Sequence, residues 1–110
     1  MSEQAALLDH ILEASDVAAR IVAQGPARFL ADPVLRYAAD TVISRIGECS
    51  KRLSDEALVR MPSVPWREVR GMRNRLQHAS MDTDYVLVWN VLKVEMPKVR
   101  AAVVAYRGSG

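Results

Sequence analysis

The residues best suited to chemistry lie in one short segment, 66–80, which contains Arg73 and His78. An imidazole can take the proton from a ribose 2′-hydroxyl near neutral pH, or give a proton to the leaving oxygen. A guanidinium can hold a phosphate with two hydrogen bonds and offset the charge that grows in the transition state. Arg73 and His78 are therefore the minimum set for cleaving RNA without a metal ion, and we expect Asn74 to orient Arg73 or the backbone.

The same segment is strongly basic. It contains four arginines and one glutamate, a local charge of +3 in a chain whose formal net charge is +2. We expect Arg67, Arg70 and Arg75 to contact the RNA backbone. An arginine-rich helix is more often a solvated surface, so the charge alone identifies no function.

The spacing of the two catalytic candidates constrains how they meet. Five residues separate Arg73 from His78, which places them about 140° apart around a regular helix. Either the helix unwinds near Gln77, or a second subunit completes the site. Glu48, on an earlier helix, is a candidate for orienting Arg73 or His78, and a solvated carboxylate is an equally good interpretation. Trp66 could stack on a base, although packing into the fold is the commoner role of such an aromatic residue.

The elements that must position these residues are helices, because apolar residues recur with a period near 3.6 and alternating patterns are scarce. Gly25-Pro26 ends the first helix, Asp32-Pro33 begins the second, and Asp82 and Thr83 are alternative caps for the last helix, in which Pro97 predicts a kink or restart. The expected elements are helices over 5–22, 33–53, about three turns from 66, and 85–107, with one short turn over 56–60.

These patterns predict an all-α, up-down bundle of four to five helices. We expect one domain over residues 1–107 and a flexible tail over 108–110. Half of the chain is apolar and a quarter is charged, which excludes a disordered protein, and the single Cys49 excludes a disulfide framework. We predict no membrane span, no secretory leader and therefore a cytoplasmic protein. We expect no cofactor and no metal site, since His10 has no partner at ligand spacing.

The order of the segments resembles the HEPN superfamily, specifically the HepT-like toxins that are encoded beside minimal nucleotidyltransferases. The most specific part of the resemblance is the family's Arg-x4-His-x-Tyr motif, which Arg73 and His78 match. The other matching segments are 11–12, 46–48, 65–66, 71–74, Trp89 and Pro97.

The resemblance implies a metal-independent endoribonuclease that acts on mRNA or tRNA as the toxin of a toxin–antitoxin pair. It also implies a homodimer in which the two motifs meet at the interface, and a nucleotidyltransferase antitoxin as the partner. A second subunit would supply the geometry that the spacing of Arg73 and His78 requires.

The chain departs from the family motif at its third position, which is Ser80 rather than tyrosine. In families of this kind the tyrosine accepts AMP from the partner, and this modification silences the toxin. Ser80 lacks the reach and acidity of a phenol. Tyr85 is an alternative acceptor, or else an amphipathic cap on the core. The departure supports an alternative function, a non-catalytic helical dimer that binds a nucleotide and docks a nucleotidyltransferase.

Overall fold

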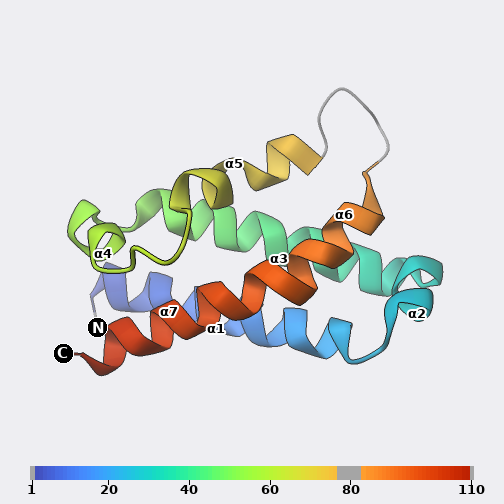
Figure 1. Ribbon diagram of the computed structural model, residues 1–110, viewed down its shortest axis with the longest axis horizontal. Coiled ribbons are helices and arrows are strands. Elements are labelled where there is room, and N and C mark those ends of the chain that lie inside the picture. The colour runs from blue at the N-terminus through green and yellow to red at the C-terminus, as the bar shows by residue number, and fades with distance from the viewer. Residues whose placement is uncertain (1, 77–82, 110) are drawn as a thin grey trace.

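Four long helical segments form the body of the fold, and two short helices connect them (Figure 1). The computed structural model describes residues 2–76 and 83–109, and for 75 and 76 the backbone only; these ranges contain no β-strand. The predicted all-α bundle is confirmed. The elements are α1 (Glu3–Val22), α2 (Pro26–Ala31), α3 (Pro33–Arg52), α4 (Asp55–Val59), α5 (Trp66–Leu76), α6 (Tyr85–Asn90), the π-helix η1 (Val91–Glu95) and α7 (Met96–Gly108).

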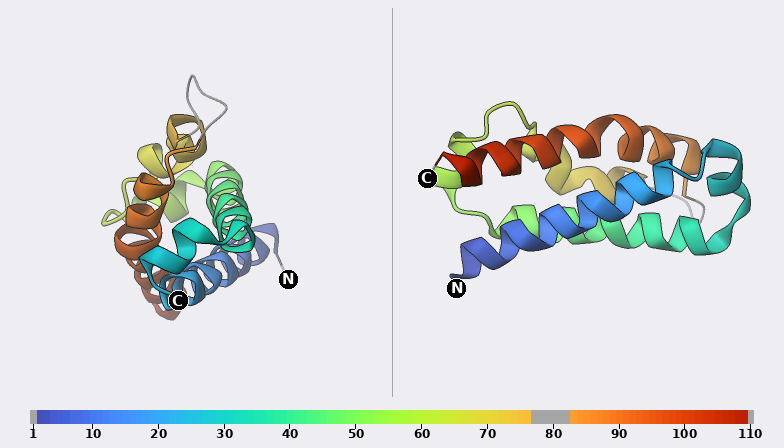
Figure 2. Two further views of the ribbon diagram at one scale, coloured as in Figure 1. Left: turned by 90° about the vertical axis from the view of Figure 1, so that its right-hand side faces the viewer. Right: turned by 90° about the horizontal axis from the view of Figure 1, so that it is seen from below.

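The long helices pack side by side, with α3 in contact with both α1 and α5, and α7 in contact with α1. Figure 2 shows this arrangement from the end and from below. The two chain termini and α4 lie at one end of the molecule, and α2 lies at the other. None of the described helices is both long enough and apolar enough to cross a bilayer.

Apolar residues at helical spacing on α1 and α3 form much of the core. The stripe of α1 is buried from Leu7 to Ile21, and that of α3 is buried from Ala39 to Cys49. Continuous burial of such stripes is the main stabilising contribution to a helical bundle. The core residues with no exposed surface at all are Ile11, Ala18, Phe29, Ala39, Ile46, Val88 and Val103.

Helix α2 was not expected, because we predicted only that the first helix ends at Gly25-Pro26. Gly25 has a φ of 88°, and Pro26 then stands in the first turn of the new helix, where its missing N–H costs nothing. The short helix carries Phe29 into the core, where its ring centroid lies 5.5 Å from that of Trp89 and 6.1 Å from that of Tyr85. This single anchoring aromatic residue explains why six residues form a helix here.

The predicted caps are partly confirmed. Asp32 caps α3, since its Oδ1 accepts a hydrogen bond of 2.9 Å from the Val34 N–H. The prediction for the last helix was wrong, because Asp84 rather than Asp82 or Thr83 caps α6. Its Oδ1 accepts from the N–H groups of Val86 and Leu87 at 3.1 and 3.2 Å. A cap must stand two or three residues before the free amides, and the burial of Val88 fixes that register.

The expected restart at Pro97 is confirmed and takes the form of a π-helix. Pro97 has no N–H to give to the preceding turn, and the N–H of Met96 donates instead to the carbonyl of Val91, five residues back. Helix α7 then continues through Gly108, one residue past the predicted domain end, and the N–H of Ser109 caps it.

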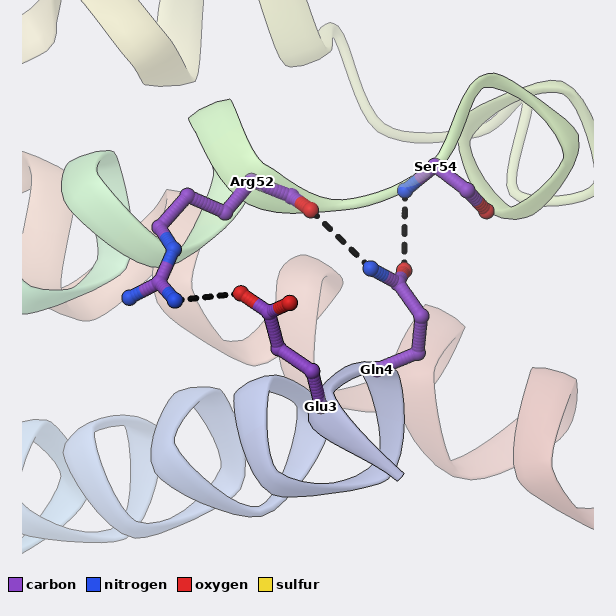
Figure 3. Close-up of polar contacts among 4 residues, drawn as sticks. All are labelled: Glu3, Gln4, Arg52 and Ser54. Carbon is purple, nitrogen blue, oxygen red and sulfur yellow. Dashed lines mark hydrogen bonds and ion pairs between the residues drawn. The ribbon is translucent and has the colours of Figure 1, made fainter.

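The start of α1 is clasped to the turn between α3 and α4 (Figure 3). The side chain of Gln4 donates to the Arg52 carbonyl at 3.0 Å and accepts from the Ser54 N–H at 2.8 Å. An exposed ion pair joins Glu3 to Arg52 beside it. Gln4 thereby satisfies the last carbonyl of α3 and the N–H of Ser54, the N-cap of α4, and this fixes the end of α3 that carries Lys51.

Candidate active site between α3 and α5

A close approach of two backbones brings the candidate site together. Gly47 of α3 is buried, and a Cβ placed on it would lie 3.7 Å from the carbonyl oxygen of Val69 and 3.8 Å from that of Arg70. A methyl group would therefore just fit, while a longer side chain would push α5 away. Helix α5 lies directly beside α3 at this point (Figure 1). Polar side chains that are 19 or more residues apart in sequence therefore border the same surface.

Two adjoining hollows lie on this surface, and they share Ser44, Glu48 and Arg73. The smaller hollow has a volume of about 40 Å³ and the larger about 350 Å³. The smaller is completed by Gly47, Lys51, Arg70 and Asn74. The larger is completed by Asp40, Thr41 and Arg45.

Four residues that the sequence singled out meet here. Arg70, Arg73 and Asn74 come from α5 and Glu48 comes from α3. Arg73, Asn74 and Glu48 are exposed, whereas Arg70 is half-buried. Arg73 and Glu48 border both hollows, although no ion pair joins them among the described residues. The guanidinium of Arg73 is thus open to a ligand.

Other predicted site residues lie elsewhere or outside the described ranges. Arg67 is exposed on α5 but lines neither hollow. The side chain of Arg75 and the whole of His78 and Ser80 lie outside what the structure describes, so the meeting of Arg73 with His78 stays a prediction. Trp66 is buried and its Nε1 donates to the Met61 carbonyl at 3.1 Å, so it packs into the fold and offers no face to a base.

The hollows beside α5 differ in the charge of the residues that line them. Three cations and one carboxylate line the smaller hollow, which makes it positive. The larger hollow has two arginines against two carboxylates, and hydroxyl groups between them. A third hollow of about 350 Å³ lies between the other flank of α5 and the α6–η1 run, and its only charged residues are Glu68 and Glu95. Of these three hollows of the described residues, the smaller one between α3 and α5 therefore favours a phosphate.

Sequence reasoning missed Lys51 and Arg45, which stand on α3. The spacing of Ser44, Glu48 and Lys51 puts them on one helix face, which was a usable signal. The pattern of α3 alone does not show that α5 packs against that face. From the sequence, Lys51 and Arg45 therefore look like ordinary solvent-exposed residues.

Tyr85 packs as the predicted amphipathic cap on the core. It is half-buried against Phe29, and its hydroxyl donates to Oδ2 of Asp40 at 2.7 Å. Burial raises the pKa of the Tyr85 phenol above its ordinary value of 10.0, and the hydrogen bond to Asp40 raises it further. Use of Tyr85 as an AMP acceptor stays a prediction, and this hydroxyl would first have to leave Asp40.

The raised pKa of Tyr85 predicts how stability depends on alkaline pH. The folded state holds the phenolic proton more tightly than the unfolded state, so this stabilisation is complete below pH 10.0, the ordinary value, and is lost as the pH rises through the folded pKa. We expect wild type to lose more stability above that pH than Tyr85→Phe, in denaturant unfolding across the pH range. Equal losses in the two proteins would contradict the raised pKa.

The described residues contain no group of three or more His, Cys, Asp or Glu side chains placed to hold a metal ion. Cys49, the one cysteine, is buried in the core, and burial raises the pKa of its thiol.

The model of one protein family, the HepT-like ribonucleases, matches residues 11–105 of the chain. A candidate RNase of Methanocaldococcus jannaschii is 35% identical over 75 residues, which are 68% of this chain and 69% of that protein. A candidate RNase of Caldanaerobacter subterraneus is 32% identical over 97 residues, 87% of each chain. A candidate ribonuclease HepT of Thermococcus cleftensis is 32% identical over 72 residues, 66% of each chain.

No solved structure was found to match the chain. The family match extends over both helices that build the site, from the middle of α1 to near the end of α7. Arg73 of the sequence motif lies on the positively charged side of α5. On the family model and these relatives, the chain belongs to the HepT-like ribonuclease family.

Proposed function

We propose that the chain is a metal-independent endoribonuclease that binds RNA across the two hollows between α3 and α5. The observation that carries the proposal is the placement of Arg73, the motif arginine, where both hollows meet and where its guanidinium is exposed. The positive smaller hollow suits a phosphate, and the larger, charge-balanced hollow with its hydroxyl groups suits a nucleoside.

The proposed reaction is an internal phosphoryl transfer. His78 takes the proton of the ribose 2′-hydroxyl, the 2′-oxygen attacks phosphorus, and the bond from phosphorus to the 5′-oxygen breaks. The leaving oxygen receives a proton from the imidazolium of the site, which restores the neutral imidazole. Arg73 holds the non-bridging oxygens through this step. The products are a 2′,3′-cyclic phosphate and a 5′-hydroxyl, and no water is consumed.

In the biological setting that we propose, the chain is a cytoplasmic toxin that acts as a homodimer. The second subunit brings its own motif to the interface, and a nucleotidyltransferase serves as the antitoxin. Support comes from the family membership and from the angular separation of Arg73 and His78 on a regular helix.

The alternative function is a non-catalytic dimer that docks a nucleotidyltransferase and presents a nucleotide to it. One observation favours it, which is Ser80 at the position of the motif tyrosine. In that case Arg73 and the cations around it form an anion site only.

The deciding experiment incubates the purified chain with total RNA and with tRNA in the presence of EDTA. We expect fragments that carry 5′-hydroxyl and cyclic-phosphate ends, because the mechanism uses only protein groups and the ribose itself. Growth arrest on expressing the chain alone would agree with this. Intact RNA together with harmless expression would contradict the proposal and favour the docking function.

A further inference from the structure

We infer that Lys51 of α3, together with Arg70, binds an RNA phosphate next to the one that is cleaved. The inference rests on the proposed ribonuclease function and extends its site along the strand. Lys51 is exposed in the last turn of α3 and lines the smaller hollow with Arg70 and Arg73.

The dimensions and charge of the smaller hollow suit a phosphate group. Its volume of about 40 Å³ is small beside the about 350 Å³ of the larger hollow, which suits a compact group such as a phosphate. Three cations surround it and Glu48 is the one carboxylate. The lining of the hollow therefore remains positively charged after the negative charge of Glu48 is subtracted.

The state of Arg70 points to the same ligand. Its Nε atom is buried, and in the part of the chain that the structure describes it has no hydrogen-bond partner. A buried donor without an acceptor is costly, at about 1–3 kcal/mol. Arg70 as a whole is half-buried and lines the hollow, so an anion there would lie beside the accessible part of this cationic side chain.

The register of the two helices places this phosphate beside the scissile one. Residues 44–51 of α3 share the smaller hollow with 70–74 of α5, whereas 40–48 share the larger hollow with Arg73. Moving from Arg70 to Arg73 along α5 therefore leads away from Lys51 and toward Asp40. Helix α5 continues past Arg73 to Leu76 in that same direction, so Lys51 lies on the other side of Arg73 from the end of α5.

A second explanation of Lys51 is structural. A lysine in the last turn of a helix interacts favourably with the helix dipole, at about 0.3–1 kcal/mol. This role affects the unfolding free energy and leaves RNA binding unchanged, so the two explanations separate in a single set of measurements.

The test measures binding of a 2′-O-methyl RNA oligonucleotide, which cannot be cleaved, by fluorescence anisotropy over a series of KCl concentrations. For Lys51→Ala we expect an affinity roughly threefold to tenfold lower, and a salt slope smaller by about 0.7, the value for one phosphate of a single strand. Lys51→Arg should keep the wild-type slope. Lys93→Ala is the matched control, because Lys93 is exposed but lines neither hollow.

An unchanged salt slope in Lys51→Ala overturns the inference. If the melting temperature of this variant is also lowered, Lys51 acts by stabilising the end of α3 instead. Absence of RNA binding by wild type overturns it as well. The readout does not depend on cleavage. If wild type binds this RNA with the Lys51-dependent slope but cuts no RNA, the phosphate contact of Lys51 stands and only the proposed catalytic function fails.

Discussion

Replacing His78 with alanine is expected to lower RNA cleavage in EDTA by about 10²- to 10⁴-fold, the usual contribution of a general acid–base group. Without the imidazole, the 2′-hydroxyl must lose its proton to water, and the leaving oxygen has no positioned acid. Single-turnover cleavage of a labelled RNA measures the effect. Binding of 2′-O-methyl RNA should change little, because the phosphate contacts are retained.

The chain provides a matched control in His10, the other histidine. His10 is exposed on α1, and its Nδ1 lies 3.5 Å from Nη1 of Arg45. His10→Ala should cleave RNA at the wild-type rate, which would show that the loss belongs to the position and not to histidine content. Cleavage that persists undiminished in a folded His78→Ala protein removes His78 from the mechanism.

The long helices of the fold were predictable from the sequence because their apolar residues recur with the helical period. The apolar rows of α1 and α3 identify most of their buried residues, since an amphipathic pattern reflects burial directly, but Ala19 of that pattern is exposed. Helix α2 was missed because six residues around one aromatic residue, Phe29, are too few to show a period. The cap at Asp84 was missed because three neighbouring polar residues offered similar caps, and only the packing of Val88 selects among them.

The candidate site was predictable on α5 but not on α3. The excess of arginine in 66–80 and the family motif identify Arg73 from sequence, and the structure places Arg70 and Asn74 around the same hollow. Lys51 joins them only because Gly47 lets the α5 backbone approach α3. This is a tertiary contact between residues about 20 positions apart, and it cannot be inferred from the sequence pattern of either helix.

The exposure of Arg73 where the two hollows meet leads to a prediction about the shape of its side chain. We expect Arg73→Ala to lower kcat/KM for RNA cleavage by about 10²- to 10³-fold, as removal of a donor to a transition-state oxyanion does. Arg73→Lys keeps the charge but loses the paired donors, so it should recover only part of that loss. The effect should lie mainly in kcat, because the contact strengthens as negative charge grows on the phosphate.

The control for Arg73 is Arg20→Ala, because Arg20 is an exposed arginine of α1 that lines neither hollow. It should leave kcat and KM unchanged. Full activity in Arg73→Lys would show that a point charge suffices and would contradict the paired hydrogen bonds. A purely electrostatic anchor would instead raise KM in Arg73→Ala at constant kcat. The split between kcat and KM therefore decides whether the guanidinium acts on the transition state or only holds the RNA.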